Sequence, residues 1–441
     1  MRYVGGSLQA EFMVRVRGVD PRACLVAPVD VGKVEAMALV ADHHGEIVVA
    51  PFRFALTERG YAEFAAAVTF ASAERDAQVC RVGVESAGHY HKTLVARLRT
   101  TGFDVVELNP AAVKQARAQQ LLARLKTDQL DLGAMAELLV RGAGRPPQCR
   151  SEAMAEQAAW VAHRRRKWRA HRSLRQQIHA QLDLVFPGLA GCFANVLDSR
   201  SGWVILRDIP DPARIIRLGA DGLRRYVQRR GVRMTRMKAA QVLDAARVVL
   251  ALPAPERATL EQILSADLAL LAAIDDQIAA AETELARLLP DTPAGVLISL
   301  PGVGAVRASN YGAALGDPAR FPNAAAAYAA AGLVPARYES AGSRRSGLGI
   351  TKAGSIELRQ AIIDLGNGLG HHHPEFLAYR QQLRTRGKPS NVAAVALGHR
   401  AHRLAFAMVR DQQPYDSERW EASTREGRPV MAKTIRSTTA T

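Results

Sequence analysis

Four acidic residues stand where their carboxylates could hold divalent metal ions. Asp30 lies in the first apolar segment that predicts a β-strand, and Glu85 ends the fourth. Asp128 and Asp131, three residues apart in a predicted helix, share one helical face. Four converging carboxylates repel one another unless cations neutralise them, and hard oxygen ligands suit Mg²⁺ or Mn²⁺. Jointly they predict a two-metal site for phosphoryl transfer, although each alone is also typical of a strand end or a solvated helix face.

A second candidate group is the segment PARYESAGSRRSGLGITKAG in the C-terminal third. A serine hydroxyl attacks phosphate only when a base or a metal activates it and cations stabilise the phosphate. The cations are local, but no base is. The histidines 371–373 are a candidate base or metal site, or a helix end that faces solvent. The segment alone therefore predicts a phosphate-binding loop and leaves the nucleophile open. Its hydroxyl and basic residues are Ser340, Ser343, Ser346, Arg337, Arg344, Arg345 and Lys352.

The order of the predicted elements explains how the carboxylates could meet. After an N-terminal extension (1–21), residues 22–148 predict three strands, a helix, and then alternating strands and helices. This is the layout of an RNase H-like α/β domain, in which the first and fourth strands are neighbours. Asp30 and Glu85 then lie side by side, and glycines and prolines at 142–149 end the domain. The predicted strands are 22–32, 35–42, 46–56, 78–85 and 104–110, and the predicted helices are 58–71, 89–102 and further segments through about 139.

Residues 149–292 predict an all-α, coiled-coil-like region with a basic insertion at about 185–250. Its two basic stretches, 160–175 and 214–238, cannot turn every charge toward a core, so they predict phosphate-contacting surfaces. Trp168 and Tyr226 within them either stack on bases or anchor the helices, of which anchoring is the more typical. The candidate contacts are Arg164, Arg165, Arg166, Lys167, Arg229 and Arg230.

A heptad seam is predicted near the end of this helical region. Apolar residues step alternately by three and four from Leu271 to Leu288, and the pattern continues back through Leu264 to Leu260. Such spacing indicates a helix that pairs with another helix, either of the same chain or of a second copy.

Residues 293–412 predict a mainly α-helical C-terminal domain, followed by a polar, disordered tail over 413–441. Gly302 and Gly304 in LPGVG make a tight turn between two helical stretches, which resembles a helix-hairpin-helix element. The exposed backbone N–H groups of such a turn hold a DNA phosphate without reading sequence. Further candidate phosphate contacts in the loop that follows are Arg337, Arg344, Lys352 and Arg359.

The composition indicates a folded protein with a polyanionic partner. The 441 residues carry a formal net charge of +17, mostly from arginine, whose planar fork pairs with phosphate. A GC-rich genome, in which arginine and alanine are common, is the alternative source of this excess. Four cysteines without CxxC spacing favour neither a zinc site nor disulfides. With no signal peptide and no membrane-length apolar run, we expect a cytoplasmic protein that is nucleoid-associated when bound to DNA.

Six short motifs occur in a fixed order in the two halves of the chain. They are VDVGK at Asp30, VESAGHY at Glu85, LNPAAVK at 108–114, KTDQLD at 126–131, LPGVG at 300–304, and AGLVPARYES through ITKAGSIELR. In this order they resemble the insertion-sequence 110/116/902-type transposases, a family of bridge-RNA-guided serine recombinases. The resemblance covers most of residues 22–145 and 295–412, whereas the N-terminal extension and the long helical section exceed the compact family pattern.

The resemblance implies a RuvC-like variant of the RNase H fold, with the four carboxylates as metal ligands. It also implies that Ser340, rather than Ser343, attacks DNA and holds a covalent phosphoserine link while strands are exchanged. The carboxylates and the serine then form one composite site across subunits of a homo-oligomer, a dimer or a tetramer. The resemblance further implies a structured noncoding guide RNA that pairs with donor and target DNA.

Two other functions stay open on the sequence alone. One is an RNase H-like metal-dependent nuclease or junction resolvase, in which water attacks and Ser340 only binds phosphate. The other is a catalytically inactive nucleic-acid-binding protein derived from a transposase. The presence of all four carboxylates and the serine argues against inactivity.

Overall fold

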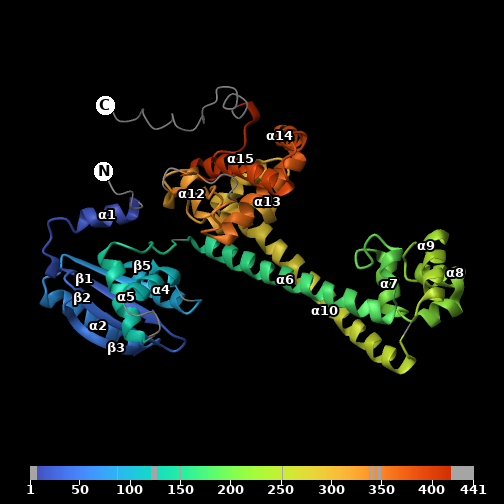
Figure 1. Cartoon of the computed structure of the whole chain (residues 1–441), viewed down its shortest axis with the longest axis horizontal. Coiled ribbons are helices and arrows are strands. Elements are labelled where there is room, and N and C mark those ends of the chain that lie inside the picture. The colour runs from blue at the N-terminus through green and yellow to red at the C-terminus, as the bar shows by residue number, and fades with distance from the viewer. Residues whose placement is uncertain are drawn as a thin grey trace. The chain divides into compact units, whose positions relative to one another are not determined.

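The computed structural model divides the chain into two compact units, Met1–Cys149 and Arg150–Thr441, each of which is described by itself (Figure 1). The division falls at the glycine- and proline-containing segment 142–149. In the described part of the chain no helix is long and apolar enough to cross a membrane. The structure describes residues 7–86, 88–120, 127–148, 150–250, 252–336, 339–340, 343–344 and 349–418.

A five-stranded sheet forms the centre of the first unit. The strand order is β3-β2-β1-β4-β5, with β1 antiparallel to β2 and parallel to β4. This confirms the predicted mixed α/β domain, because three antiparallel strands come first and two strands parallel to β1 extend the sheet. The strands are β1 (Cys24–Val31), β2 (Glu35–Asp42), β3 (Ile47–Ala55), β4 (Val79–Glu85) and β5 (Asp104–Leu108).

Helices cover both faces of this sheet, because its central strands bury apolar side chains on both sides. Alternate residues of β1 point to opposite faces. Leu25 and Val29 pack in the layer of α2 and α3, whereas Val26 packs in the layer of α4 and α5. The helices are α2 (Glu58–Glu74), α3 (His91–Thr100), α4 (Pro110–Gln120) and α5 (Asp128–Val140).

The N-terminal extension packs onto this domain. Helix α1 (Ser7–Arg15) buries Phe12, and the Arg81 guanidinium lies 3.6 Å from the centroid of that ring. Arg81 and Arg15 both donate to Asp104, at 3.2 and 3.0 Å. Burial lowers the pKa of Arg81, and the Asp104 charge opposes that shift. Helix α1 therefore covers the end of the sheet at which β1 and β4 begin.

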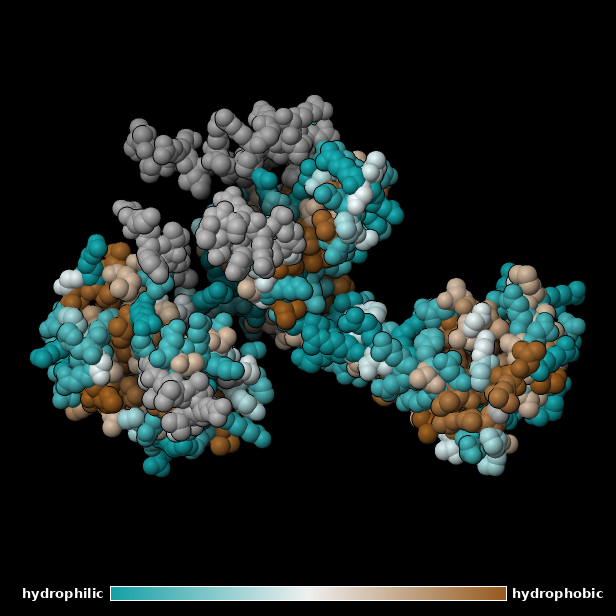
Figure 2. Space-filling model, in the orientation of Figure 1, coloured by the Kyte–Doolittle hydropathy of each residue, from teal (hydrophilic) through white to brown (hydrophobic). Residues whose placement is uncertain are grey.

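Two long antiparallel helices, α6 (Glu152–Val185) and α10 (Ala254–Leu288), form the spine of the second unit (Figure 1). The heptad seam of α10 is buried against α6, so the helix pairs within its own chain. Polar contacts reinforce the pair, as in the hydrogen bond of 2.7 Å from Gln181 to Asp267. The visible face of α6 is largely hydrophilic (Figure 2).

Residues 186–250, nearly all of the predicted insertion at about 185–250, form a helical lobe at one end of this pair. Its apolar core includes buried residues from the ends of α6 and α10. Helix α8 is kinked at Gly219, which has a φ of 64°. The lobe helices are α7 (Arg200–Asp208), α8 (Pro212–Gln228) and α9 (Arg236–Val248).

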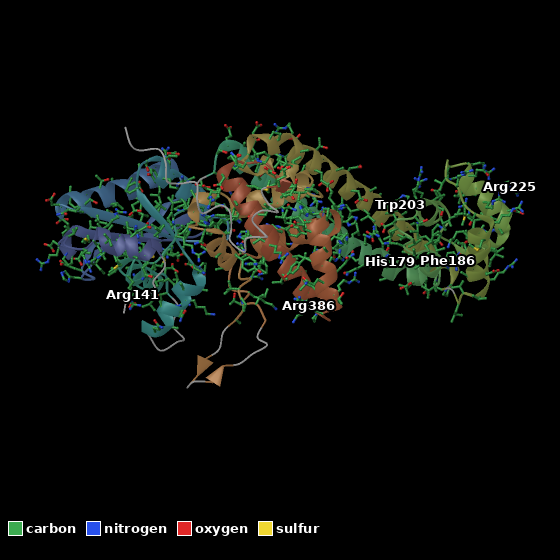
Figure 3. The ribbon with its side chains drawn as sticks, turned by 90° about the horizontal axis from the view of Figure 1, so that it is seen from above. Arg141, His179, Phe186, Trp203, Arg225 and Arg386 are labelled. Atoms are coloured by element: carbon green, nitrogen blue, oxygen red, sulfur yellow. The ribbon has the colours of Figure 1, made fainter. Side chains whose placement is uncertain are left out.

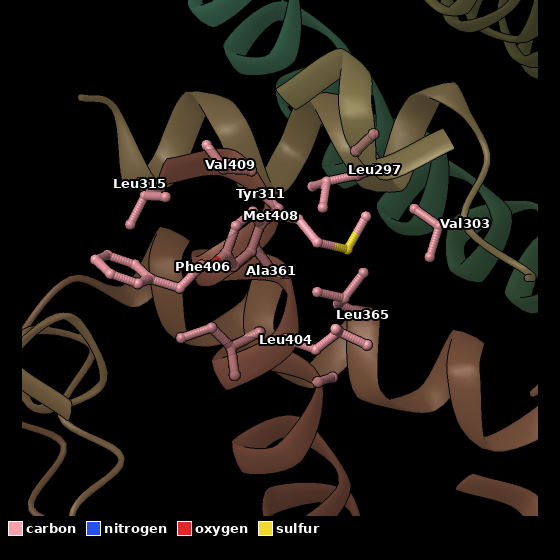
Figure 4. Packing of buried hydrophobic residues seen from close by; sticks show 14 of the residues in the cluster. Leu297, Val303, Tyr311, Leu315, Ala361, Leu365, Leu404, Phe406, Met408 and Val409 are labelled. Atoms are coloured by element: carbon pink, nitrogen blue, oxygen red, sulfur yellow. The ribbon is translucent and has the colours of Figure 1, made fainter. Parts of the chain in front are cut away.

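The C-terminal helices pack around a third apolar core (Figure 4). Tyr311 is fully buried there, and its hydroxyl lies 3.0 Å from Nδ1 of His402. Nε2 of His402 lies 2.8 Å from the Ala324 carbonyl oxygen, so both ring nitrogens have partners. The helices are α11 (Ala305–Leu315), α12 (Ala324–Ala330), α13 (Ile356–His372), α14 (Pro374–Thr385) and α15 (Ser390–Asp411).

Candidate functional site

Asp30 and Glu85 lie side by side at one end of the sheet. In the parallel pairing of β1 with β4, Val29 faces Val84, and the two acidic residues follow in the same register. Both point to the face covered by α5, because Val29 and Val84 belong to the opposite apolar layer. The two residues are partly buried. The predicted proximity of the first and fourth strands is confirmed.

Helix α5 approaches this face closely. A Cβ on Gly83 of β4 would lie 2.5 Å from the Leu139 side chain, so a larger residue there would require that side chain to move. At the start of α5, the Thr127 hydroxyl caps the helix by accepting a backbone hydrogen bond of 3.3 Å. Asp128 and Asp131 occupy the first turn, where the helix dipole favours carboxylates.

An arginine on the sheet holds the first of these aspartates. Arg53 of β3 donates to Asp128 at 3.0 Å. Across the sheet Arg53 is the register partner of Met37, and Met37 is the register partner of Asp30, so the three share one row on one face. The Arg53–Asp128 pair therefore places the first turn of α5 over the row that contains Asp30.

A second arginine holds the other aspartate. Asp131 is 5% exposed and forms an ion pair with Arg117 of α4. Sequence analysis missed both arginines. Arg53 precedes its partner by 75 residues and Arg117 by 14, and no motif marks either pairing.

The carboxylates fit a divalent cation by their chemistry. Within the described ranges, no three histidine, cysteine, aspartate or glutamate side chains already lie together as metal ligands. Asp131 is buried and pairs with Arg117, whereas Asp128 is half exposed and pairs with Arg53, so an arginine contacts one oxygen of each carboxylate. All four residues offer the hard oxygen ligands that Mg²⁺ and Mn²⁺ prefer.

Ser340 lies on a small hairpin in the C-terminal domain. Strand β6 (Glu339–Ser340) pairs antiparallel with β7 (Ser343–Arg344), and Ser340 is the register partner of Ser343. The predicted contact Arg337 lies outside the described residues, as do Arg345 and Ser346. The hairpin thus brings the two candidate serines opposite each other on neighbouring strands.

The base of this hairpin is a backbone ladder between the AGLVP and ITKAG motifs. N–H groups of the second motif donate to carbonyls of the first, as from Lys352 to Gly332 at 3.0 Å. Arg359 of α13 donates to the Ala331 and Lys352 carbonyls, at 2.9 and 2.7 Å. Arg359, predicted to contact phosphate, therefore secures the loop in this structure, whereas the Lys352 residue is exposed.

The two glycines of the PGVG turn differ. Gly302 has a φ of +81°, and a Cβ there would lie 2.5 Å from Cβ of His372. Gly304 begins α11 with a φ of −88°, and nothing lies within 4 Å of a Cβ built on it. The segment before the turn, Pro293–Ser299, is a 3₁₀ helix and not an α-helix. The predicted turn between two helical stretches is therefore present, with a 3₁₀ helix before it and α11 after it.

The three consecutive histidines end α13. His371 and His372 are exposed, as expected for a helix end, but His373 is 3% exposed. Burial lowers the pKa of His373, and its Nε2 lies 2.6 Å from the Tyr415 hydroxyl. The expectation of a solvent-facing cluster is wrong for His373. Packing of Tyr415 also extends the ordered domain beyond 413, where the sequence predicted a disordered tail.

Part of the first basic stretch serves the helix spine. Arg164 donates to Glu282 of α10 at 2.6 and 2.8 Å, and its guanidinium lies 5.6 Å from the Trp168 ring centroid. Arg165 pairs with Glu357 of α13 at 3.2 Å. Both arginines therefore hold helices together in this structure, and Trp168 packs against one of them.

Other predicted phosphate contacts face solvent. Arg166 and Arg229 are exposed and Lys167 is partly exposed, and none has a side-chain partner among the described residues. Arg230 instead stacks on Tyr226, 3.8 Å from its ring centroid. Tyr226 packs against the lobe core, in agreement with the anchoring role.

Two family models match the chain. A model described as a transposase, of the IS110 type with a DEDD domain, matches residues 27–187. A model described as the transposase IS116/IS110/IS902 family matches residues 294–381. Together they account for more than half of the chain, and they match the segments that hold the carboxylates and the serine.

Similar proteins come from bacterial insertion elements. The chain is 28% identical over 245 residues to an uncharacterised 43.6 kDa protein of insertion element IS110 from Streptomyces coelicolor, which covers 55% of this chain and 59% of that protein. It is 26% identical to an uncharacterised 44.8 kDa protein of IS116 from Streptomyces clavuligerus, over 72% of this chain and 77% of that protein. It is 30% identical to the transposase for IS1328 from Yersinia enterocolitica, over 30% and 41% of the two chains. The chain belongs to the IS116/IS110/IS902 family of transposases.

Proposed function

We propose that this chain is an insertion-sequence transposase that cuts and rejoins DNA through Ser340, with divalent metal ions held by its α/β domain. That domain is then a RuvC-like variant of the RNase H fold. The observation that carries the proposal is the placement of Asp30 and Glu85 on the sheet face below the first turn of α5. This turn carries the other two carboxylates, Asp128 and Asp131.

The reaction follows from the chemistry of a serine and a phosphodiester. Ser340 Oγ forms a bond to phosphorus as the bond from that phosphorus to one deoxyribose oxygen breaks. The proton lost by the hydroxyl ends on the released sugar oxygen. Mg²⁺ or Mn²⁺ bound by the four carboxylates would stabilise charge on the attacking and leaving oxygens. Exposed Lys352, together with Arg344, would offset the charge of the phosphate.

Rejoining is the reverse reaction with another strand. The sugar hydroxyl of a second DNA strand attacks the phosphoserine, and the serine oxygen leaves with a proton. Because the phosphate ester bond is conserved throughout, the exchange needs no energy-rich cofactor. This is why a covalent enzyme link suits recombination better than hydrolysis, which would leave a broken strand.

The proposal includes three partners. They are donor and target DNA, a structured noncoding guide RNA, and further copies of this chain in a dimer or tetramer. The net charge of +17 and the exposed arginines of the helical lobe support polyanionic partners. Base pairing with a guide would carry the sequence information, as in other RNA-guided systems. The serine of one chain would then work beside carboxylates of another.

Trapping of the covalent intermediate tests the nucleophile. Purified protein with its co-purified RNA, Mg²⁺ and radiolabelled donor DNA is denatured during reaction and resolved on a gel. Wild type and Ser343→Ala should give a protein–DNA adduct, and Ser340→Ala should give none. Ser343 is a matched control because it is the register partner of Ser340.

Cleavage without any adduct would contradict the serine mechanism and leave a metal-dependent nuclease in which water attacks. Sequencing of the co-purified RNA tests guidance separately. A defined transcript from beside the element would support a guide, whereas random cellular RNA would remove the guide from the proposal.

A further inference from the structure

Two adjoining hollows share Trp203, the larger where the helical lobe meets the long helices and the smaller lined by lobe residues alone. Their volumes are about 340 and 410 Å³, which is within the range of small-molecule sites. Trp203 of α7 lines both of them. In Figure 3 this residue lies on the side of the lobe next to the long helices, and Arg225 lies toward its far side. The sequence analysis had not singled out Trp203.

Aromatic, apolar and charged side chains all line the larger hollow, and its two carboxylates, Asp198 and Asp275, are paired with Arg175 and His171. Trp168 of α6 and Trp203 both line it, and Trp168 is 36% exposed. Leu197 and Leu271, which are almost fully buried, also line it. Nδ1 of His171, in the same lining, is buried and has no hydrogen-bond partner among the described residues. This arrangement combines stacking surfaces with a polar group that the protein itself leaves unsatisfied.

Arginines without partners stand at the openings. Arg172 lines the larger hollow and Arg200 the smaller, and both are exposed. Within the described chain neither has an ion pair or a hydrogen bond from its side chain. By contrast, Arg175 is fixed by Asp198 at 2.8 Å. The two unpartnered guanidinium groups are therefore available to an anion outside the protein.

The whole lobe carries a positive excess, as does the basic stretch 160–175 on α6. Residues 186–250 include twelve arginines and lysines but only five acidic residues. The excess of seven charges in 65 residues is a large share of the total of +17. The exposed lobe arginines without a described partner are Arg200, Arg217, Arg225, Arg229, Arg233 and Arg236.

We propose that the two hollows around Trp203 bind unpaired nucleotides of a nucleic-acid strand. A base stacks against Trp203 or Trp168, and Arg172 and Arg200 neutralise the flanking phosphates. Bases inside a duplex are stacked on one another and cannot enter such a hollow, whereas every unpaired base has a free aromatic face. The inference rests on the proposed function only in taking nucleic acid as the partner. Single-stranded RNA and single-stranded DNA share this chemistry.

Binding measurements on the full-length Ser340→Ala protein test the inference without any cleavage. The probes are fluorescent single-stranded RNA, single-stranded DNA of the same sequence, and the matching duplex DNA. We expect Trp203→Leu and the double variant Arg172→Gln/Arg200→Gln to raise the single-strand Kd about tenfold or more. The duplex Kd should change less than about twofold. Arg217→Gln is the matched control, because Arg217 is exposed on the same lobe but lines neither hollow.

The arginine double variant guards against misfolding, because both side chains are exposed and Trp203 packs against the lobe core. Quenching of tryptophan fluorescence by the unlabelled strand should accompany binding and fall in Trp203→Leu. The single strand, RNA or DNA, whose Kd rises more in the variants is the ligand of the hollows. An equal rise in Kd for single strands and duplex, or an unchanged single-strand Kd, would overturn the inference. Neither result would affect the adduct assay, which tests the proposed function separately. If no nucleic acid binds the Ser340→Ala protein whose lobe is unchanged, the proposed function fails as well.

Discussion

The α/β domain and the C-terminal domain hold their candidate chemistry in different ways. Asp30 and Glu85 belong to strands that hydrogen bonds and two apolar layers fix on both sides. Ser340 belongs to a two-residue strand, and the described contacts that secure it act at the base of the hairpin through backbone carbonyls and Arg359. Asp30 and Glu85 are therefore set by sheet register, whereas the described backbone of Ser340 is paired only within a small hairpin.

The same contrast appears in how charge is balanced. The aspartates of α5 are already paired with Arg53 and Arg117. At the serine loop, Lys352 is exposed. The carboxylates of one domain are thus paired with arginines of the same domain, whereas the lysine of the other is open to solvent.

Among the changes that test this comparison, removal of one sheet carboxylate should have the largest effect, measured as loss of DNA cleavage. We expect Asp30→Asn to lower DNA cleavage by roughly two to three orders of magnitude, because the metal site loses a charged ligand. The matched control is Glu137→Gln, which changes an acid at the far end of α5 that pairs with Arg141. Gel analysis of cleavage products measures both. If Asp30→Asn cleaved DNA at a rate within tenfold of wild type, Asp30 would not be a ligand of the catalytic metal.

Acidification should destabilise the C-terminal domain more than the α/β domain, through protonation of His402. Burial lowers the pKa of His402 from 6.5 to about 4. The unfolded chain therefore takes up a proton at the His402 imidazole at a higher pH than the folded chain does. The stability that the neutral imidazole contributes is fully present above pH 6.5 and is lost as the pH falls toward 4. The loss at pH 4.5 is about 2–3 kcal/mol.

Hydrogen exchange of α11 and α15 peptides at pH 7 and pH 4.5 measures that loss. His402→Gln costs stability at pH 7, and its deficit relative to wild type should shrink at pH 4.5. Burial also lowers the pKa of His373 and His399, so a smaller slope should persist in the variant. A deficit that is independent of pH would show that folding does not lower the pKa of His402.

The sequence was sufficient for elements whose register or periodicity repeats. The apolar run EAMALVAD between two turns predicted β2 at its observed bounds, and the heptad spacing predicted the buried face of α10. Pairings made by tertiary packing could not be read in this way. Arg117 meets Asp131 only because α4 and α5 pack together, and Trp203 lines a hollow only because α7 folds back on the long helices. The glycines of PGVG indicated a turn but not that His372 fills the space beside it.

Two alanine substitutions test that turn. Gly302→Ala should destabilise the C-terminal core by about 2 kcal/mol, because it combines a positive φ with overlap of His372. Gly304→Ala should cost less than about 1 kcal/mol, since its φ is ordinary and no atom lies near its Cβ. Denaturant unfolding measures both. If Gly304→Ala weakens duplex DNA binding without this loss, the turn contacts phosphate. An equal loss of unfolding free energy in the two variants would show that neither the positive φ of Gly302 nor its contact with His372 matters for stability.

The smallest effect separates structural from nucleic-acid-binding arginines on α6. Arg164→Gln should lower stability by about 1 kcal/mol, because it breaks a partly screened pair with Glu282. Arg166→Gln should leave stability unchanged, since the side chain is exposed and without a described partner. It should instead weaken nucleic-acid binding and reduce the slope of log Kd against log salt by about one. If Arg164→Gln changed the salt slope and Arg166→Gln did not, the assignment of the two arginines would be reversed.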